Sequence, residues 1–112
     1  MAKNLSFNFN TLPKKYFNTT LKDGTTLLLE MPKLKTFKKI GELQKMQADE
    51  DQDVEYVMSV LADVMAECLS TNKQGIKVNA DQVAEDYDVA EITAFIADYY
   101  EKFVGSIQNN PN

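Results

Sequence analysis

Three acidic residues at alternate positions, Asp49, Asp51 and Asp53, form the arrangement in this sequence that most resembles a metal site. A calcium-binding loop begins with side-chain oxygens at its first, third and fifth positions. Such a loop continues with a glycine at its sixth position and a glutamate at its twelfth, where this chain has Val54 and Val60. We therefore interpret the acidic stretch as a solvated leader before a helix and expect no metal site.

Nucleophilic and acid–base catalysis have few candidates in this chain. The single cysteine, Cys68, lies on an apolar stripe, and no histidine is present to activate a thiol. Histidine is also the commonest general base and transition-metal ligand. The lysine-rich segment 33–45 has no glycine-rich loop beside it that would cradle a phosphate. We expect Cys68 to be a core residue, and we expect no enzyme activity, no cofactor and no small-molecule substrate.

The charge of the chain is unevenly distributed. The net charge is −5, and all twelve basic residues are lysine. Because arginine is preferred for contacts to phosphates and bases, this composition argues against a nucleic-acid partner. Residues 1–46 hold nine lysines against three acids, whereas residues 47–112 hold three lysines against fourteen acids. This polarity could steer the basic half of one copy towards the acidic half of another, so we expect a homo-oligomer; the alternative is two solvated surfaces.

Length and hydropathy limit the class of protein. The 112 residues suit a single domain with one core, spanning residues 1–112. No stretch approaches the roughly 20 apolar residues of a membrane span, and the first residues lack the apolar core of a signal peptide. We expect a soluble, cytoplasmic protein without a membrane partner.

Residues 5–9 alternate between apolar and polar side chains, with Leu5, Phe7 and Phe9 as the apolar set. This period of two predicts a short strand, which ends before Pro13. Residues 1–13 are therefore interpreted as an N-terminal strand outside the main core. Two alternatives stay open: the strand is frayed, or a partner completes it.

A β-hairpin is predicted over residues 16–31, and two registers compete for it. A two-residue Asp23-Gly24 loop would divide the leucines between both faces of the hairpin. A loop one residue longer, with Gly24 in a left-handed conformation, pairs Leu21 with Thr25 and gathers the apolar residues on one face. We choose the second register for this reason. Its apolar face consists of Phe17, Thr19, Leu21, Leu27, Leu29 and Met31.

Helical patterns follow the hairpin, and the most regular apolar stripe runs from Val54 to Cys68. Asn79 and Asp88 are the predicted N-caps of the later helices, and Glu91 completes a capping box with Asp88. Since the hairpin and the helices each have one apolar face to bury, the expected fold class is α+β, with the hairpin packed on a small bundle of about four helices. The predicted helices cover residues 33–46, 53–70, 80–85 and 89–107, and a polar, flexible tail covers residues 108–112.

The last predicted helix is apolar over more than one face. Its core stripe runs from Val89 to Ile107, and a flank beside that stripe carries Ala97, Tyr100 and Val104. The apolar arc is wider than a single core contact requires. We predict that these three flank residues bind a partner. The alternatives are additional burial in the core and contact with the N-terminal strand or a neighbouring subunit.

The order of several segments is similar to that of a known family. The hairpin YFNTTLKDGTTL (16–27) followed by MPK (31–33) resembles the start of tail assembly chaperones of long-tailed, siphovirus-type bacteriophages and prophages of Gram-positive hosts. The stretch NKQGI with Val78 (72–78) resembles their inter-helix turn, and residues 95–112 resemble their closing helix and tail. The resemblance covers about residues 14–112 and contains no catalytic fingerprint.

The resemblance implies a small cytoplasmic protein that binds and solubilises the tape measure protein and helps to recruit tail-tube subunits. It further implies self-association, absence from the mature virion and, in many members, a longer frameshifted product. It implies no catalytic, cofactor or metal site. Two alternatives from other classes are a small structural tail adaptor that is retained in the virion and an enzyme of unknown type.

Overall fold

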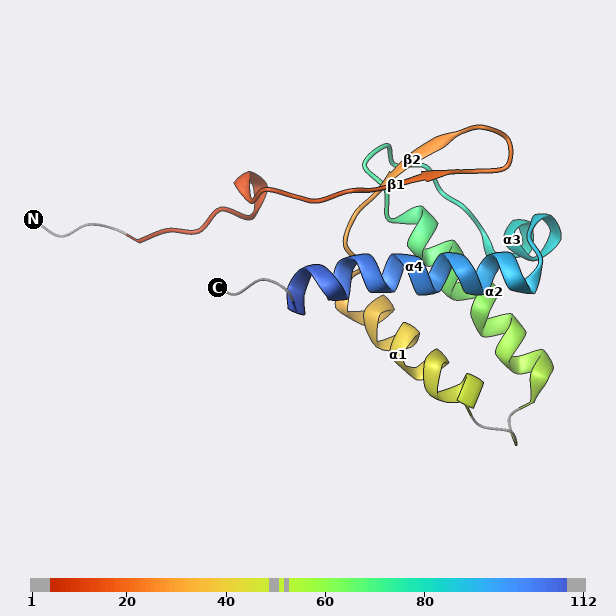
Figure 1. Cartoon of the computed structure of the whole chain (residues 1–112). Helices are drawn as coiled ribbons and strands as arrows, with labels where there is room; N and C mark the ends of the chain where they lie inside the picture. Colours follow the sequence, from red (N-terminus) through yellow and green to blue (C-terminus); the bar gives the residue numbers. More distant parts are fainter. Residues whose placement is uncertain (1–4, 49–50, 52, 109–112) are drawn as a thin grey trace, which may run out of the picture.

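The computed structural model describes residues 5–48, 51 and 53–108 of the chain. A two-stranded hairpin is followed by helices that lie beneath it (Figure 1), which confirms the predicted α+β class and the packing of a hairpin on a small helical bundle. From residue 17 onwards the elements begin and end close to the predicted positions. They are a short 3-10 turn (Phe9–Thr11), β1 (Phe17–Thr20), β2 (Thr26–Leu29), α1 (Leu34–Ala48), α2 (Val54–Ser70), α3 (Ala80–Asp86) and α4 (Val89–Gln108).

The hairpin has the longer of the two predicted loops. Phe17 lies opposite Leu29 in the antiparallel pair, and the Leu21 N–H donates to the Thr25 carbonyl over 2.8 Å. Gly24 has a φ of +94°, the left-handed conformation that this loop requires and that glycine adopts without steric cost. The predicted register is therefore confirmed.

The apolar face of the hairpin forms part of the core. Leu27 and Leu29 are fully buried, and Phe17 and Leu21 pack against the buried cluster. Met31 was expected on the same face, but it lies beyond the end of β2 and is 44% exposed. That expectation was wrong because the alternation of faces holds only while the chain stays in the sheet.

The outer edge of β2 is closed by the connection between α2 and α3. The Glu30 N–H donates to the Thr71 carbonyl over 2.8 Å, and the Lys73 N–H donates to the Leu28 carbonyl over 2.9 Å. The Gln74 side chain adds a third contact, because its Oε1 accepts the Leu28 N–H at 3.1 Å. This edge of the sheet thus has its hydrogen bonds satisfied within the chain.

Helix α2 is the centre of the bundle and packs against α1, α3, α4 and β2. Its N-terminus is capped by Asp53, whose Oδ1 accepts the Glu55 N–H at 3.0 Å. The capping box of α4 is also formed: the Asp88 carboxylate accepts the Glu91 N–H at 2.7 Å, and the Glu91 carboxylate accepts the Asp88 N–H at 2.8 Å. Both caps fix where a helix begins. The Asp88 cap was predicted from the sequence, whereas Asp53 was predicted as the first residue of its helix and is the cap before it.

Tyr99 of α4 joins the hairpin to the helices. Its ring lies 5.8 Å from that of Phe17, 5.7 Å from that of Phe95 and 4.9 Å from that of Phe103, measured between centroids. Its hydroxyl donates to the Glu30 carbonyl over 2.7 Å, so the buried polar group has a partner. The predicted packing of the hairpin on the last helix is therefore present.

The predicted strand over residues 5–9 is not formed. These residues run away from the body as an arm (Figure 1), and the chain makes a 3-10 turn at Phe9–Thr11 that is capped by Asn8. The physical reason is that no strand among the described residues lies beside the arm, and a strand needs a hydrogen-bonding neighbour. At the other end, α4 includes Gln108, while the rest of the predicted tail lies outside the described residues.

Candidate partner-binding surface

The predicted flank of α4 lies where this helix faces α1. Ala97 is exposed, whereas Tyr100 and Val104 are partly buried. The Tyr100 ring lies 5.3 Å from the ring of Phe37 in α1, measured between centroids. The flank therefore combines an accessible residue with two that already contact their own chain, and a partner would meet only part of the Tyr100 ring.

Charged side chains border this flank. Asp98 and Glu101 are exposed, and Asp98 forms an ion pair of 3.6 Å with Lys102, one turn along the helix. Such exposed pairs contribute little stability but keep the surrounding surface hydrated. The result is a narrow apolar strip within a polar surface. Its role in binding stays a prediction.

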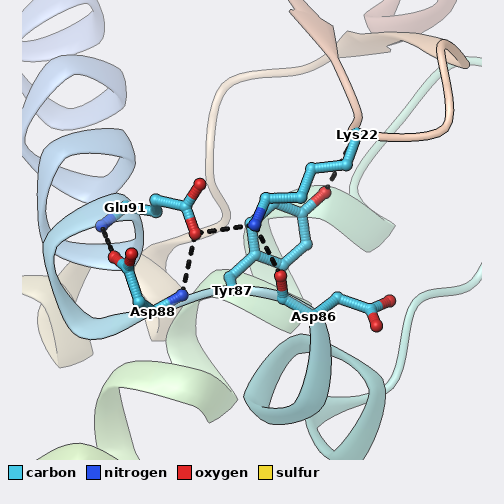
Figure 2. A network of polar contacts seen from close by, with 5 residues as sticks. All are labelled: Lys22, Asp86, Tyr87, Asp88 and Glu91. Carbon is cyan, nitrogen blue, oxygen red and sulfur yellow. Dashed lines mark hydrogen bonds and ion pairs between the residues drawn. The ribbon is translucent and has the colours of Figure 1, made fainter.

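A polar clamp joins the hairpin turn to the corner between α3 and α4 (Figure 2). The Lys22 ammonium lies 2.8 Å from a Glu91 carboxylate oxygen and donates to the Asp86 carbonyl over 2.7 Å. The same ammonium lies 4.9 Å from the centroid of the Tyr87 ring, a cation–π distance. Three kinds of contact thus hold one lysine in a fixed position.

The clamp fixes the charge states of its two main members. The hydrogen bond from Lys22 holds the pKa of Glu91 below its usual value, and the Asp88 N–H adds to this effect. The hydrogen bond to Glu91 raises the pKa of Lys22 in turn. Because each group is held in its charged form at neutral pH, the pair is suited to fastening two elements together and not to exchanging protons.

A cavity of about 380 Å³ lies beside the clamp. Two of the polar residues that line it, Lys22 and Asp23, are already engaged: Lys22 binds Glu91, and the Asp23 carboxylate accepts the Thr25 N–H at 2.9 Å. A further part of the wall is apolar. The apolar lining consists of Leu21, Leu69, Val78, Val83 and the ring of Tyr87.

Cys68 is fully buried in α2, as predicted for a core residue. Burial raises the pKa of its thiol to about 12, so the reactive thiolate is essentially absent at neutral pH. A second buried titratable group, Tyr99, has its pKa raised mainly by burial as well. Both groups are held in their neutral forms by the core.

Glu67 of α2 fastens α1 to the centre of the bundle. One of its carboxylate oxygens lies 2.6 Å from the Lys39 ammonium, and the other accepts the Thr36 hydroxyl at 3.2 Å. The Glu91 and Glu67 pairs both join a lysine of the basic half to an acid of the acidic half. Some of the opposite charges of the two halves therefore pair with each other within a single copy.

The acidic stretch before α2 is only partly described. Asp49 lies outside the described residues, and Asp53 acts as a helix cap. In the described part of the chain, no group of three or more His, Cys, Asp or Glu side chains could hold a metal ion. No helix over the described residues is both long enough and apolar enough to cross a membrane.

The N-terminal arm, residues 5–12, carries the two most exposed large apolar side chains among the described residues, Leu5 and Phe9. Leu5 is 97% exposed, Phe9 is 78% exposed and Phe7 is 65% exposed. The Phe7 and Phe9 rings contact each other with centroids 4.8 Å apart. Exposed aromatic residues side by side on a folded chain are typical of a segment that is covered by a partner.

The sequence does not predict the clamp or the closed edge of β2. Lys22 and Glu91 are 69 residues apart, and Leu28 and Gln74 are 46 residues apart. No local pattern marks such pairs, because lysine, glutamate and glutamine at exposed positions are ordinary surface residues until the fold brings them together.

Comparison of the chain with models of protein families, with curated proteins and with solved structures found no match.

Proposed function

We propose that this chain is a tail assembly chaperone of a long-tailed bacteriophage or prophage, which binds and solubilises the tape measure protein while the tail is built. The observation that carries the proposal is the order of segments over about residues 14–112, which resembles that family. The proposal places the protein in the bacterial host cytoplasm during assembly and outside the mature virion. Tail-tube subunits are its second proposed partner.

A long helical tape measure protein cannot bury its apolar stripes before the tube has formed around it, so it needs a soluble cover. A helix flank such as Ala97, Tyr100 and Val104 offers a narrow apolar strip that suits an amphipathic helix. The net charge of −5 would help to keep the resulting complex dispersed.

Co-expression of the tape measure with this chain tests the proposal. The wild-type chain should raise the soluble fraction of the tape measure severalfold. Tyr100→Asp should abolish the effect, but this change also removes the contact with Phe37. Ala97→Glu is therefore the cleaner variant, since Ala97 is exposed and its replacement disturbs no core contact.

Matched controls separate the site from the function. Ala90→Glu makes the same change at another exposed position of α4, and Tyr56→Asp makes the tyrosine-to-aspartate change at an exposed position of α2. Both should leave the tape measure soluble. If Ala97→Glu and Tyr100→Asp are harmless while the wild type solubilises the tape measure, the site is wrong. If the tape measure is equally soluble without the chain, the chaperone function is wrong.

Self-association is the remaining part of the proposal. The basic half of one copy would contact the acidic half of the next, head to tail, which closes into a ring or continues as a filament. Light scattering at low and high salt measures this directly. The mean mass should exceed that of the 12.7 kDa monomer at low salt and fall as salt screens the charges. A monomer under all conditions would contradict self-association.

A further inference from the structure

The two edges of the hairpin differ in a way that points to a partner. The β2 edge is closed by residues 71–74, as described above. Since the Leu21 N–H donates towards β2, the backbone groups of Asn18 and Thr20 point away from it. No hydrogen bond from the described residues reaches these outward groups. An edge strand with free N–H and C=O groups is a template for another strand.

The arm could fill this free edge, because it has the sequence pattern of a strand and no neighbouring strand among the described residues. Leu5, Phe7 and Phe9 alternate with Ser6 and Asn8, so a paired arm would bury one face and leave the other in water. The three apolar side chains are instead exposed. The same chain therefore has one unpaired strand-like segment and one unpaired strand edge.

The arm does not reach the β1 edge of its own chain. The Lys14 ammonium lies 2.9 Å from a Glu30 carboxylate oxygen, and the Lys73 ammonium lies 5.5 Å from the centroid of the Tyr16 ring. These contacts hold residues 14–16 along the line of β1, past the end of β2. The arm consequently leaves the body instead of turning back beside β1 (Figure 1).

We propose that the arm of one copy pairs with β1 of a second copy as an antiparallel third strand. One register places apolar residues opposite the inward-facing residues of β1 and polar residues opposite its outward-facing ones. A slip by one residue would turn all three apolar side chains to the solvent face. In the proposed register the opposite residues are Leu5 and Leu21, Ser6 and Thr20, Phe7 and Thr19, Asn8 and Asn18, and Phe9 and Phe17.

One feature of the receiving surface favours this occupant. The rings of Phe17 and Phe95, 6.3 Å apart, are only partly buried and would be covered by an added strand that places Phe9 beside Phe17. The arm and the receiving copy thus agree in hydrogen bonding and in apolar pattern.

This interaction does not depend on binding of the tape measure or on the head-to-tail contact between charged halves, and cysteine cross-linking tests it. Asn8→Cys is mixed with a tagged Asn18→Cys variant under mild oxidation, so that a mixed dimer has its own mass. We expect a mixed disulfide dimer in high yield. Cys68 does not interfere because it is buried and protonated. The matched control is Asn8→Cys mixed with tagged Thr26→Cys, which lies on the exposed face of β2, one strand further away; its yield should be several times lower.

Three cross-linking results would overturn the proposal. One is the absence of a mixed dimer, and another is an equal yield with Thr26→Cys. The third is a double variant, Asn8→Cys with Asn18→Cys, that forms only an internal disulfide, since this would place the arm on its own β1. As a check without new cysteines, removal of residues 1–12 should lower the mean mass in light scattering. An armless chain that associates as strongly as the full chain would also overturn the proposal.

Discussion

The N-terminal arm and strand β2 are two strand-like apolar segments of one chain with opposite environments. Leu27 and Leu29 of β2 are fully buried, whereas Leu5 of the arm is 97% exposed. Strand β2 has β1 on one side and residues 71–74 on the other, while the arm has no neighbouring strand among the described residues. Alternating apolar and polar residues thus show that a segment can form a strand, but the strand forms only where another strand offers a free edge to pair with.

The largest expected difference in stability comes from shortening a leucine in each of the two segments. Leu27→Ala should lower the free energy of unfolding by about 2–5 kcal/mol, because it leaves a cavity in the core. Leu5→Ala should change it by less than about 0.5 kcal/mol in dilute solution, because the side chain is solvated. Urea denaturation measures both values. A Leu5→Ala variant as unstable as Leu27→Ala would mean that the arm packs on its own body.

The second test weakens the segment 71–74, which closes the outer edge of β2; the arm has no such neighbour among the described residues. Asn72 is buried, and its amide group donates to the Leu69 and Ile76 carbonyls, each over 2.7 Å. Asn72→Ala should cost about 1–3 kcal/mol, because these carbonyls lose their donor in a buried place. Gln74→Ala, in which the lost contacts are exposed, should cost less. Equal losses in urea denaturation would contradict this ranking.

The sequence predicts the features of the fold that depend on neighbouring residues, and it does not predict those that depend on distant segments. The hairpin register followed from Gly24 and from the need for one apolar face, and the α4 start followed from the Asp88–Glu91 box; both depend on neighbours in the sequence. The closure of β2 by Gln74 and the contact of Tyr100 with Phe37 depend on segments that meet only in the folded chain. The three flank residues lie on α4, and the partial burial of Tyr100 and Val104 agrees with the alternative of additional burial in the core. Phe37 could not be predicted as the neighbour of Tyr100 from the sequence.

The third test concerns β1, which is paired with β2 along one edge and has no neighbouring strand among the described residues along the other. Its inward-facing Thr19 hydroxyl is buried without a hydrogen-bond partner among the described residues. Thr19→Val keeps the shape and removes the unsatisfied group, so it should raise the free energy of unfolding by about 1 kcal/mol. The exposed neighbour gives the control: Thr20→Val should change stability by less. A destabilised Thr19→Val variant would show that the hydroxyl has a partner.

The smallest expected effect concerns the clamp that fastens the hairpin to the body. The pKa of Glu91 is held below its usual 4.5, so the contribution of the pair is present above pH 4.5 and is lost as pH falls through the lowered pKa. The pKa of Lys22 is raised above 10.5, so its contribution is present below pH 10.5 and is lost as pH rises through the raised pKa.

Glu91→Gln removes the ion pair, so it should lower the free energy of unfolding only in the pH range where the pair is charged. Wild type should exceed Glu91→Gln in the free energy of unfolding at neutral pH, and the gap should narrow below pH 4.5. Glu85→Gln, an exposed carboxylate of α3, serves as the control and should follow the wild type. A gap of constant size across the acid range would show that the ion pair does not contribute.

We propose that this chain helps to build a phage tail without staying in it. The most direct measurement isolates the tape measure from cells that lack the tail-tube protein, and from finished virions, and quantifies this chain in both by mass spectrometry. We predict that the chain is abundant with the unassembled tape measure and missing from the virions. Its absence from both samples would contradict the chaperone function, and equal amounts in both would identify a structural tail adaptor instead.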